Sequence, residues 1–162
     1  MDIVIRPATV NDSEDLTEIS FASKRYWNYP EEYIKVWKDE LTIIPSYILN
    51  NTVYVAEVTG RVVGYFSLVE VKEAFGAGKV CVNKGIWLEH IFILPEYIGK
   101  GIGSKLIAIM KVQCKEMQID KVNLFSDPHA KGFYDKLGAC YIGQSPSSIE
   151  GRTVPLYDVY IS

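Results

Sequence analysis

Apolar and polar residues in the first third of the chain follow a helical spacing after one short β-branched run. Residues 3–5 predict a first strand. Asn11 or Asp12 can cap a helix that has acidic residues in its first turn and is expected to continue to about Tyr26. A second helix is expected over residues 30–41, because proline is tolerated at the first position of a helix and the two glutamates that follow favour its positive end.

In the middle of the chain, the apolar residues change from helical spacing to the alternation of a strand. A short third helix is expected at residues 46–49. Residues 52–71 (TVYVAEVTGRVVGYFSLVEV) contain two β-branched runs separated by the Thr-Gly pair at 59–60, which predicts a hairpin. The glycine-rich residues 73–79 are expected to form a loop, and residues 85–94 (GIWLEHIFIL) a further strand.

In the last third of the chain, segments with the apolar spacing of a helix alternate with segments that have the spacing of a strand. Residues 101–117 have the apolar spacing of a helix that packs one face on a sheet. A strand at 121–126, a helix at 127–138 and two strands at 140–145 and 152–161 complete the chain. The order β-α-α-β-β-β-α-β-α-β-β is typical of a mixed α/β domain with helices on both faces of one central sheet, and 162 residues suit one domain, 1–162.

Composition narrows the class of protein. The formal charge is −3, whereas a protein that coats nucleic acid needs a basic face, so no nucleic-acid partner is expected. The longest apolar stretch, 86–94, is too short for a membrane helix, so no membrane partner is expected. The three cysteines lie far apart and suggest neither a disulfide framework nor a metal site. We therefore expect a cytoplasmic protein without a secretory signal.

The stretch PEYIGKGIGSKL, residues 95–106, is the first candidate for chemistry. It joins an expected strand to an expected helix, so free amides at the helix N-terminus and the helix dipole favour a bound anion there. Its glycines remove side chains that would block close approach, although they would equally serve a simple tight turn. The stretch lacks the GxxxxGK[ST] pattern of a P-loop and the GxGxxG pattern and position of a dinucleotide fold.

The same stretch resembles the R/Q-x-x-G-x-G/A motif of the GNAT superfamily of acyl-CoA-dependent N-acyltransferases. Gly101 and Gly103 match the two glycine positions, and Ile98 stands where the family has Arg or Gln. A second stretch, DPHAKGFYDKLGA, resembles the family's N-x-x-A-x-x-F-Y-x-K-x-G-F, with Asp127 in place of Asn and Ala139 in place of Phe. The resemblance covers nearly the whole chain, since the expected order of elements is also that of the family.

The resemblance implies a GNAT-like, mostly antiparallel sheet and an N-acetyltransferase. Such an enzyme binds acetyl-CoA, and a primary amine attacks its acetyl group directly in a ternary complex. The implied cofactor contacts are Ile91, Phe92, Ile93, Ile98, Gly99, Lys100, Gly101, Ile102, Gly103, Ser104, Asp127, Ala130 and Tyr134. Without Arg or Gln at Ile98, affinity for the cofactor is expected to fall, but a cradle of backbone amides is retained.

Glu89 and Tyr134 are the expected catalytic pair. Glu89 lies within an apolar strand, where burial would raise its pKa and suit it to act as the base, and Tyr134 matches the family's acid. Each has a structural alternative, a paired carboxylate and a core tyrosine. His90 is a rival base if a bulge turns it toward the cleft, and a water chain is another. No metal is expected, because His129 has no second ligand at a suitable spacing.

The region between the first two helices is expected to border the acceptor. Tyr26, Trp27 and Tyr29 can form an aromatic wall around an amine, and Glu31 can attract a cation. Arg152 can bind a carboxylate of the acceptor. The plain alternatives are core or dimer-surface aromatics and a surface arginine.

The expected partners follow from these assignments. The acceptor is a small-molecule or peptide amine, and the final strands can pair in a homodimer. Two other functions stay open at this stage, a non-catalytic acyl-CoA-binding or regulatory module and a nucleotide-binding domain.

Overall fold

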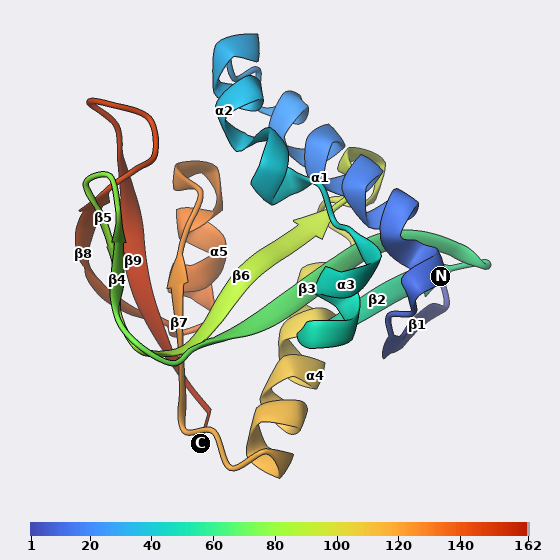
Figure 1. Ribbon diagram of the computed structural model, residues 1–162. Helices are drawn as coiled ribbons and strands as arrows, with labels where there is room; N and C mark the ends of the chain where they lie inside the picture. The colour runs from blue at the N-terminus through green and yellow to red at the C-terminus, as the bar shows by residue number, and fades with distance from the viewer. Residues whose placement is uncertain (162) are drawn as a thin grey trace. The chain divides into compact units, whose positions relative to one another are not determined.

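The computed structural model describes residues 1–161 (Figure 1). Seven strands follow one another in the sheet order β1-β2-β3-β6-β7-β9-β8, and β4 and β5 form a separate pair. The chain divides into two compact units, Met1–Leu68 with His90–Val112, and Val69–Glu89 with the segment from Gln113 onward. The single-domain assignment stays a prediction, and the two units are described in turn.

Three antiparallel strands form the sheet of the first unit, β1 (Ile3–Pro7), β2 (Thr52–Val58) and β3 (Arg61–Val71). The predicted hairpin is confirmed. Thr59 and Gly60 join β2 to β3 and both have positive φ, 52° and 79°, as a type I′ turn requires.

Helices cover both faces of β3. Alternate residues of a strand point to opposite faces, and Gly64 and Tyr65 are neighbours. A Cβ on Gly64 would lie 3.6 Å from Cγ2 of Ile102, in helix α4 (Ile102–Glu116). The Tyr65 hydroxyl lies 2.6 Å from Oγ of Ser20, in helix α1 (Ser13–Tyr26). The two helices therefore lie on opposite faces of this sheet, as Figure 1 also shows.

The predicted first three helices are confirmed, with α2 (Glu31–Leu41) and α3 (Pro45–Asn50) following α1. Proline at position 30 is the N-cap of α2 rather than its first residue. The apolar stripes of α1 and α2 bury Leu16, Ile19, Ile34, Trp37 and Leu41. Each such side chain stabilises the fold by about 1.5–3 kcal/mol.

Asp12 connects the first strand to the first helix by an ion pair. Asp12 is the N-cap residue of α1, one of the two predicted positions, but its side chain makes no capping hydrogen bond because that carboxylate is engaged elsewhere. It accepts hydrogen bonds from Nη1 and Nη2 of Arg6 at 2.8 and 3.0 Å and from the amide of Thr9 at 2.7 Å. Arg6 also donates to Glu57 of β2. These bonds, first of all that from Arg6, lower the pKa of the buried Asp12 carboxyl.

The second unit contains β7 (Lys121–Phe125), β8 (Cys140–Pro146) and β9 (Thr153–Tyr160), together with the start of β6 (Gly85–Ile93). β7 is parallel to β6 at Trp87 and Asn123, and it is antiparallel to β9, as β8 is. The ring of Trp87 lies 4.8 Å from that of Phe125. The described pairings are therefore mostly antiparallel, as predicted.

The prediction of a loop over residues 73–79 is wrong. That segment enters a small hairpin, β4 (Phe75–Ala77) and β5 (Val80–Val82), with Gly78 at a φ of 63° in the turn. Each strand has three residues, and glycine and alanine occupy two positions of β4, so the β-branched signal of a strand is almost absent there.

The predicted helix at 127–138 is divided in two. A 3₁₀ turn, η3 (Pro128–Ala130), precedes α5 (Lys131–Lys136), and Gly138 ends the segment with a φ of 80°. Proline at the first position of η3 and the Asp127 side chain, which accepts the amide of His129 at 2.9 Å, fix this start.

The Asp12 ion pair predicts a pH-dependent stability. Asp12→Asn is expected to lower the free energy of unfolding at pH 7 by about 1–3 kcal/mol, because it removes the charged acceptor of Arg6. The folded pKa lies below the ordinary 3.8, so this stabilisation is complete above about pH 4 and is lost as pH falls through the folded pKa. Urea unfolding of both proteins between pH 3 and 7 should show the gap narrowing in acid. Asp39→Asn, on the exposed side of α2, is the control, and a gap that is constant with pH would contradict this account.

Gly64 predicts a steric effect at the strand that leads to the glycine loop. A Cβ there would lie 2.8 Å from Cδ1 of Ile93 and 3.0 Å from the carbonyl oxygen of Phe92, so Gly64→Ala must displace β6 backbone. We expect a loss of about 1–3 kcal/mol in thermal or urea unfolding. Gly132→Ala is the matched control: a Cβ at this helical glycine meets nothing within 4 Å, so stability should rise by about 0.5–1 kcal/mol. Equal effects of the two changes would refute the steric argument.

Candidate functional site

The glycine loop turns the chain from β6 into α4. After β6, a 3₁₀ turn, η2 (Pro95–Tyr97), leads to Ile98 in an extended conformation. Gly99 and Gly101 then adopt φ of 78° and 81°, a region that favours glycine. A Cβ on either glycine would meet no atom within 4 Å. These glycines are therefore required by backbone conformation, and the space beside them is open.

This turn presents the N-terminus of α4 to that open space. Ile102 is 1% exposed and anchors the helix in the core of the first unit. The amide of Lys105 donates to the carbonyl of Gly101, and the amides before it precede the first intrahelical bond. Ser104, Lys100 and Lys105 are exposed around this end, so amides, helix dipole and two ammonium groups together favour an anion.

The end of β6 is held to both neighbouring elements of the first unit. Oγ of Ser23 in α1 donates to the carbonyl of Ile93 at 3.0 Å, and the amide of Leu94 donates to Val63 of β3 at 2.8 Å. Ile91, Phe92 and Ile93 are half-buried. The structure thus brings the predicted strand contacts and the glycine loop together within one unit.

The expected burial of Glu89 is wrong, although its role as base stays untested. Glu89 is exposed, whereas Leu88 and His90 on either side are 3% and 5% exposed, because successive side chains of a strand point to opposite faces. The His90 ring lies 6.2 Å from those of Tyr47 and Tyr65. The apolar run that suggested burial of the carboxylate thus buries its neighbours instead.

Tyr134 is buried in the second unit, in α5. It is 4% exposed, and its ring centroid lies 5.2 Å from Phe133 and 5.7 Å from Tyr157. Burial, and then the negative charge of Asp127, raise the pKa of its phenol. The hydroxyl therefore stays protonated at neutral pH, the state that a proton donor needs. Half-buried Ala130 lies at the end of η3, one turn before it.

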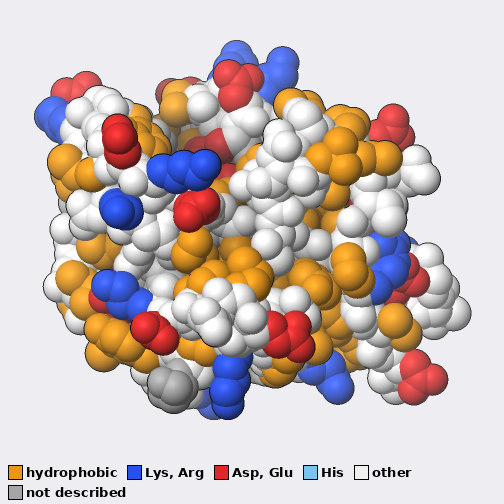
Figure 2. All heavy atoms as spheres, turned by 60° about the horizontal axis from the view of Figure 1, so that its bottom comes forward, with side chains coloured by type: hydrophobic (Ala, Val, Ile, Leu, Met, Phe, Trp, Pro, Cys, Tyr) orange, Lys and Arg blue, Asp and Glu red, His pale blue; other side chains and the backbone are white. Residues whose placement is uncertain are grey.

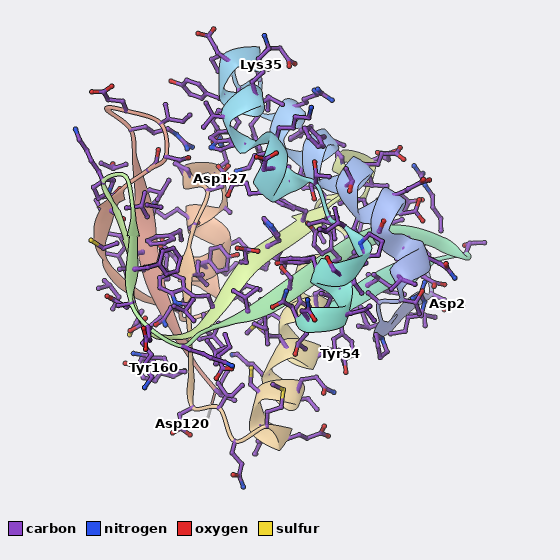
Figure 3. All side chains as sticks on the ribbon, viewed as in Figure 1. Asp2, Lys35, Tyr54, Asp120, Asp127 and Tyr160 are labelled. Carbon is purple, nitrogen blue, oxygen red and sulfur yellow. The ribbon has the colours of Figure 1, made fainter. Side chains whose placement is uncertain are left out.

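Asp127 and His129 interact at the start of η3, near the label in Figure 3. Asp127 accepts the amide of His129 at 2.9 Å and lies 2.8 Å from its ring Nδ1. His129 is exposed, as predicted for a surface or cofactor-side residue. Within residues 1–161, no three His, Cys, Asp or Glu side chains form a group suited to a metal ion.

The residues of the predicted aromatic wall contact neighbouring rings. Tyr26 and Trp27 are 48% and 38% exposed and contact each other edge-on, with centroids 4.7 Å apart. Tyr29 instead packs edge-on against Trp37 of α2 at 5.1 Å. Glu31, predicted to attract a cation, lies 3.4 Å from Nε of Arg25.

Two residues of this cluster, Lys24 and Trp37, were not predicted as site residues. Nζ of Lys24 lies over the rings of Trp37 and Tyr29, at 4.7 and 5.7 Å from their centroids. In the sequence, the only sign of these cation–π contacts is that Lys24 lies close to an aromatic stretch. In the sequence, Trp37 has the spacing of an ordinary core position of a helix, and in the structure it is buried at that position.

Arg152 lies in the second unit, in the turn that precedes β9. Its amide donates to Ile149 at 3.1 Å, its carbonyl accepts from Ser147 at 2.9 Å, and the residue is half-buried. These main-chain bonds shape the β8–β9 connection, and the carboxylate-binding role stays a prediction.

Known structures resemble the chain over its whole length. The GCN5-related N-acetyltransferase of Rhodopseudomonas palustris matches with a TM-score of 0.78 and 17% identity, over 99% of this chain and 96% of that chain. The PaiA N-acetyltransferase of Thermoplasma acidophilum, in complex with coenzyme A, gives 0.73 and 20%, over 99% of each. YncA of Salmonella typhimurium, with its cofactor acetyl-CoA, gives 0.66 and 20%, over 100% and 95%. These likenesses show the fold.

Two comparisons of the sequence with known proteins gave different results. No curated protein matches the chain. The family model of the acetyltransferase (GNAT) family matches residues 14–139, which include the glycine loop and α5. Because that match spans most of the chain, the protein belongs to the GNAT acetyltransferase family.

Proposed function

We propose that this protein transfers the acetyl group of acetyl-CoA to a primary amine, by direct attack in a ternary complex. Its family makes it an acetyltransferase with acetyl-CoA as acyl donor. The observation that carries the proposal is the open N-terminus of α4 behind Gly99 and Gly101, which suits the pyrophosphate of coenzyme A. The coenzyme A complex of the Thermoplasma protein supports this choice of anion.

The cofactor is proposed to bind mainly through main-chain groups. Amides of residues 99–104 take the pyrophosphate, and Lys100 adds positive charge. The main chain at Ile91 and Ile93 takes the pantetheine, and an amide of this strand polarises the thioester carbonyl as an oxyanion donor would. Asp127 and Ala130 contribute further cofactor contacts from the start of η3.

The chemical step requires one proton acceptor and one proton donor. The neutral amine attacks the acetyl carbon, the C–S bond breaks, and the amide product loses a proton from nitrogen while the thiolate gains one. Tyr134 is the proposed donor, because it matches the tyrosine of the family's second motif and its phenol is protonated at neutral pH. Glu89 is the proposed acceptor, and its exposure allows proton exchange with solvent. His90 or a water chain is the alternative base.

The acceptor is proposed to be a small-molecule or peptide amine. Figure 2 shows acidic and basic side chains interspersed among apolar ones on the face it presents. The formal charge of the chain is −3. Neither observation favours a nucleic acid as the partner. Among residues 1–161, no helix has the length and apolar character that a bilayer crossing needs. The protein is also predicted to form a homodimer through β8, the last strand in the sheet order. A cytoplasmic location stays a prediction.

A second candidate function is acyl-CoA binding without transfer. It is favoured by Ile98, which is 45% exposed where the family has a cofactor-binding Arg or Gln. Such a module would bind acetyl-CoA and acetylate no member of a broad panel of amines. The same measurements therefore separate it from the enzyme.

Tyr134→Phe tests the proposed transfer. Wild-type protein should bind acetyl-CoA in calorimetry and acetylate amines, and absence of any binding would overturn the proposal. Without the phenol, kcat should fall about 10²-fold or more, while the dissociation constant of acetyl-CoA changes less than about threefold. Tyr160→Phe is the control, because this tyrosine is 56% exposed at the end of β9 (Figure 3). Unchanged turnover in Tyr134→Phe would remove Tyr134 from the mechanism.

Ile98→Arg tests the cofactor loop. An arginine beside the α4 N-terminus adds a charge-assisted bond to the pyrophosphate, so the dissociation constant of acetyl-CoA should fall about tenfold, and the gain should shrink in high salt. Val112→Arg places the same charge on the exposed side of α4, where Val112 is 50% exposed, and should leave affinity unchanged. If the two variants bind equally well, the pyrophosphate does not lie at this loop.

A further inference from the structure

Tyr157, in β9, contacts the helix that carries the proposed proton donor at two successive residues. Its ring centroid lies 5.7 Å from that of Tyr134. Its hydroxyl donates to Oδ1 of Asp135, the next residue of α5, at 2.5 Å. Tyr157 itself is 0% exposed. One buried side chain of the sheet therefore touches both the proposed donor and its neighbour in the helix.

The hydrogen bond from Tyr157 to Asp135 is charge-assisted. A hydroxyl that donates to a carboxylate forms a short bond that is about twice as strong as one between neutral groups. This bond, and then that from Lys131, lower the pKa of the Asp135 carboxyl, so the acceptor is ionised at neutral pH. Nζ of Lys131 lies 2.9 Å from Oδ2. The carboxylate is thus held both from the sheet and from its own helix.

The orientation of α5 depends on its contacts with the sheet. The helix has six residues, too few to be stable by itself. Successive side chains of a helix project about 100° apart, so contacts at two successive residues restrict its rotation about its own axis. The contacts of Tyr157 with Tyr134 and Asp135 therefore restrict the direction in which the Tyr134 hydroxyl points.

Building on the proposed function, in which Tyr134 is the proton donor, we propose that Tyr157 is a positioning residue for the transfer reaction. Through its bond to Asp135 it holds α5, and with it the Tyr134 hydroxyl, in the orientation that proton transfer needs. A misplacement of about 1 Å in a reacting group can lower a rate about 10²-fold. Loss of this anchor therefore acts on turnover rather than on the binding of either substrate.

Tyr157→Phe tests the proposal, because it removes the hydroxyl and keeps the ring that packs on Tyr134. We expect kcat to fall about tenfold, while the dissociation constant of acetyl-CoA and the KM of the amine change less than about twofold. Tyr141→Phe is the matched control, since Tyr141 pairs with Tyr157 across β8 and β9 and its hydroxyl accepts from Gln144. It should leave kcat unchanged. A normal kcat in Tyr157→Phe, or an equal loss in both variants, would overturn the proposal.

Variants of the acceptor test the same bond from the helix. The Asp135 side chain is 46% exposed, so these variants also decide the matter if Tyr157→Phe does not fold. Asp135→Asn keeps an oxygen that accepts from Tyr157, whereas Asp135→Ala leaves that buried hydroxyl without its acceptor. Turnover should therefore fall in Asp135→Ala and be largely restored in Asp135→Asn. Wild-type turnover in Asp135→Ala would contradict the role of the bond.

A double-mutant cycle separates positioning from a general effect on the fold. If Tyr157 acts through Tyr134, Tyr157→Phe should lower kcat about tenfold in the wild-type background and less than about twofold in the Tyr134→Phe background. A purely structural role would give the same loss in both backgrounds and would overturn the proposal.

Failure of the proposed function is a separate outcome. If no amine is acetylated, or if Tyr134→Phe keeps full turnover, the proposed function fails, and hydrogen exchange then decides whether Tyr157 anchors α5. The amide of Ala139 donates to the carbonyl of Tyr134 at 3.1 Å, so its exchange rate reports on the end of this helix. That rate should rise about fivefold in Tyr157→Phe and stay constant in Tyr141→Phe. Unchanged exchange in Tyr157→Phe would refute the anchor itself.

Discussion

The candidate site depends on one backbone constraint, the change of direction between β6 and α4. Within a few residues the chain must leave an extended strand, expose a helix N-terminus and return Ile102 to the core. Gly99 and Gly101 make this possible because their φ of 78° and 81° would strain other residues. The open amides are a consequence of that turn, and Ile102, at 1% exposure, keeps them in place. The proposed anion site is thus a consequence of the fold at this point.

Local patterns predicted most of the fold because local physics decides those elements. The Thr59-Gly60 turn has the positive φ pair that its residue types suggest, and the stripes of α1 and α2 are buried as their spacing indicates. The prediction failed where local signals are weak or compete. Strand β4 has no β-branched residue and each strand of its hairpin has only three residues. The Asp12 side chain binds Arg6 and makes no capping bond to α1, because the guanidinium is a stronger partner than a helix amide.

The parts of the candidate site that lie in a single stretch of sequence could be predicted. Both motifs lie in single stretches. The structure gives the first the expected loop, and the second a 3₁₀ turn followed by α5 in place of one continuous helix. The surroundings of Glu89 were not predictable in the same way, since an apolar run does not reveal which of two adjacent side chains is buried. The cluster of rings around Lys24 was the least predictable feature, because its rings come from α2, the α1–α2 connection and β6, and only folding brings them to one ammonium.

Donor and acceptor recognition therefore differ in how they are encoded. Main-chain amides proposed to bind the pyrophosphate survive most substitutions. Ile98, in place of the family's Arg or Gln, is therefore predicted to weaken cofactor binding without removing it. An acceptor is recognised by side chains, which change freely on the same backbone. A family motif can for this reason identify the acyl donor, while the acceptor must be derived from the particular side chains that the fold assembles.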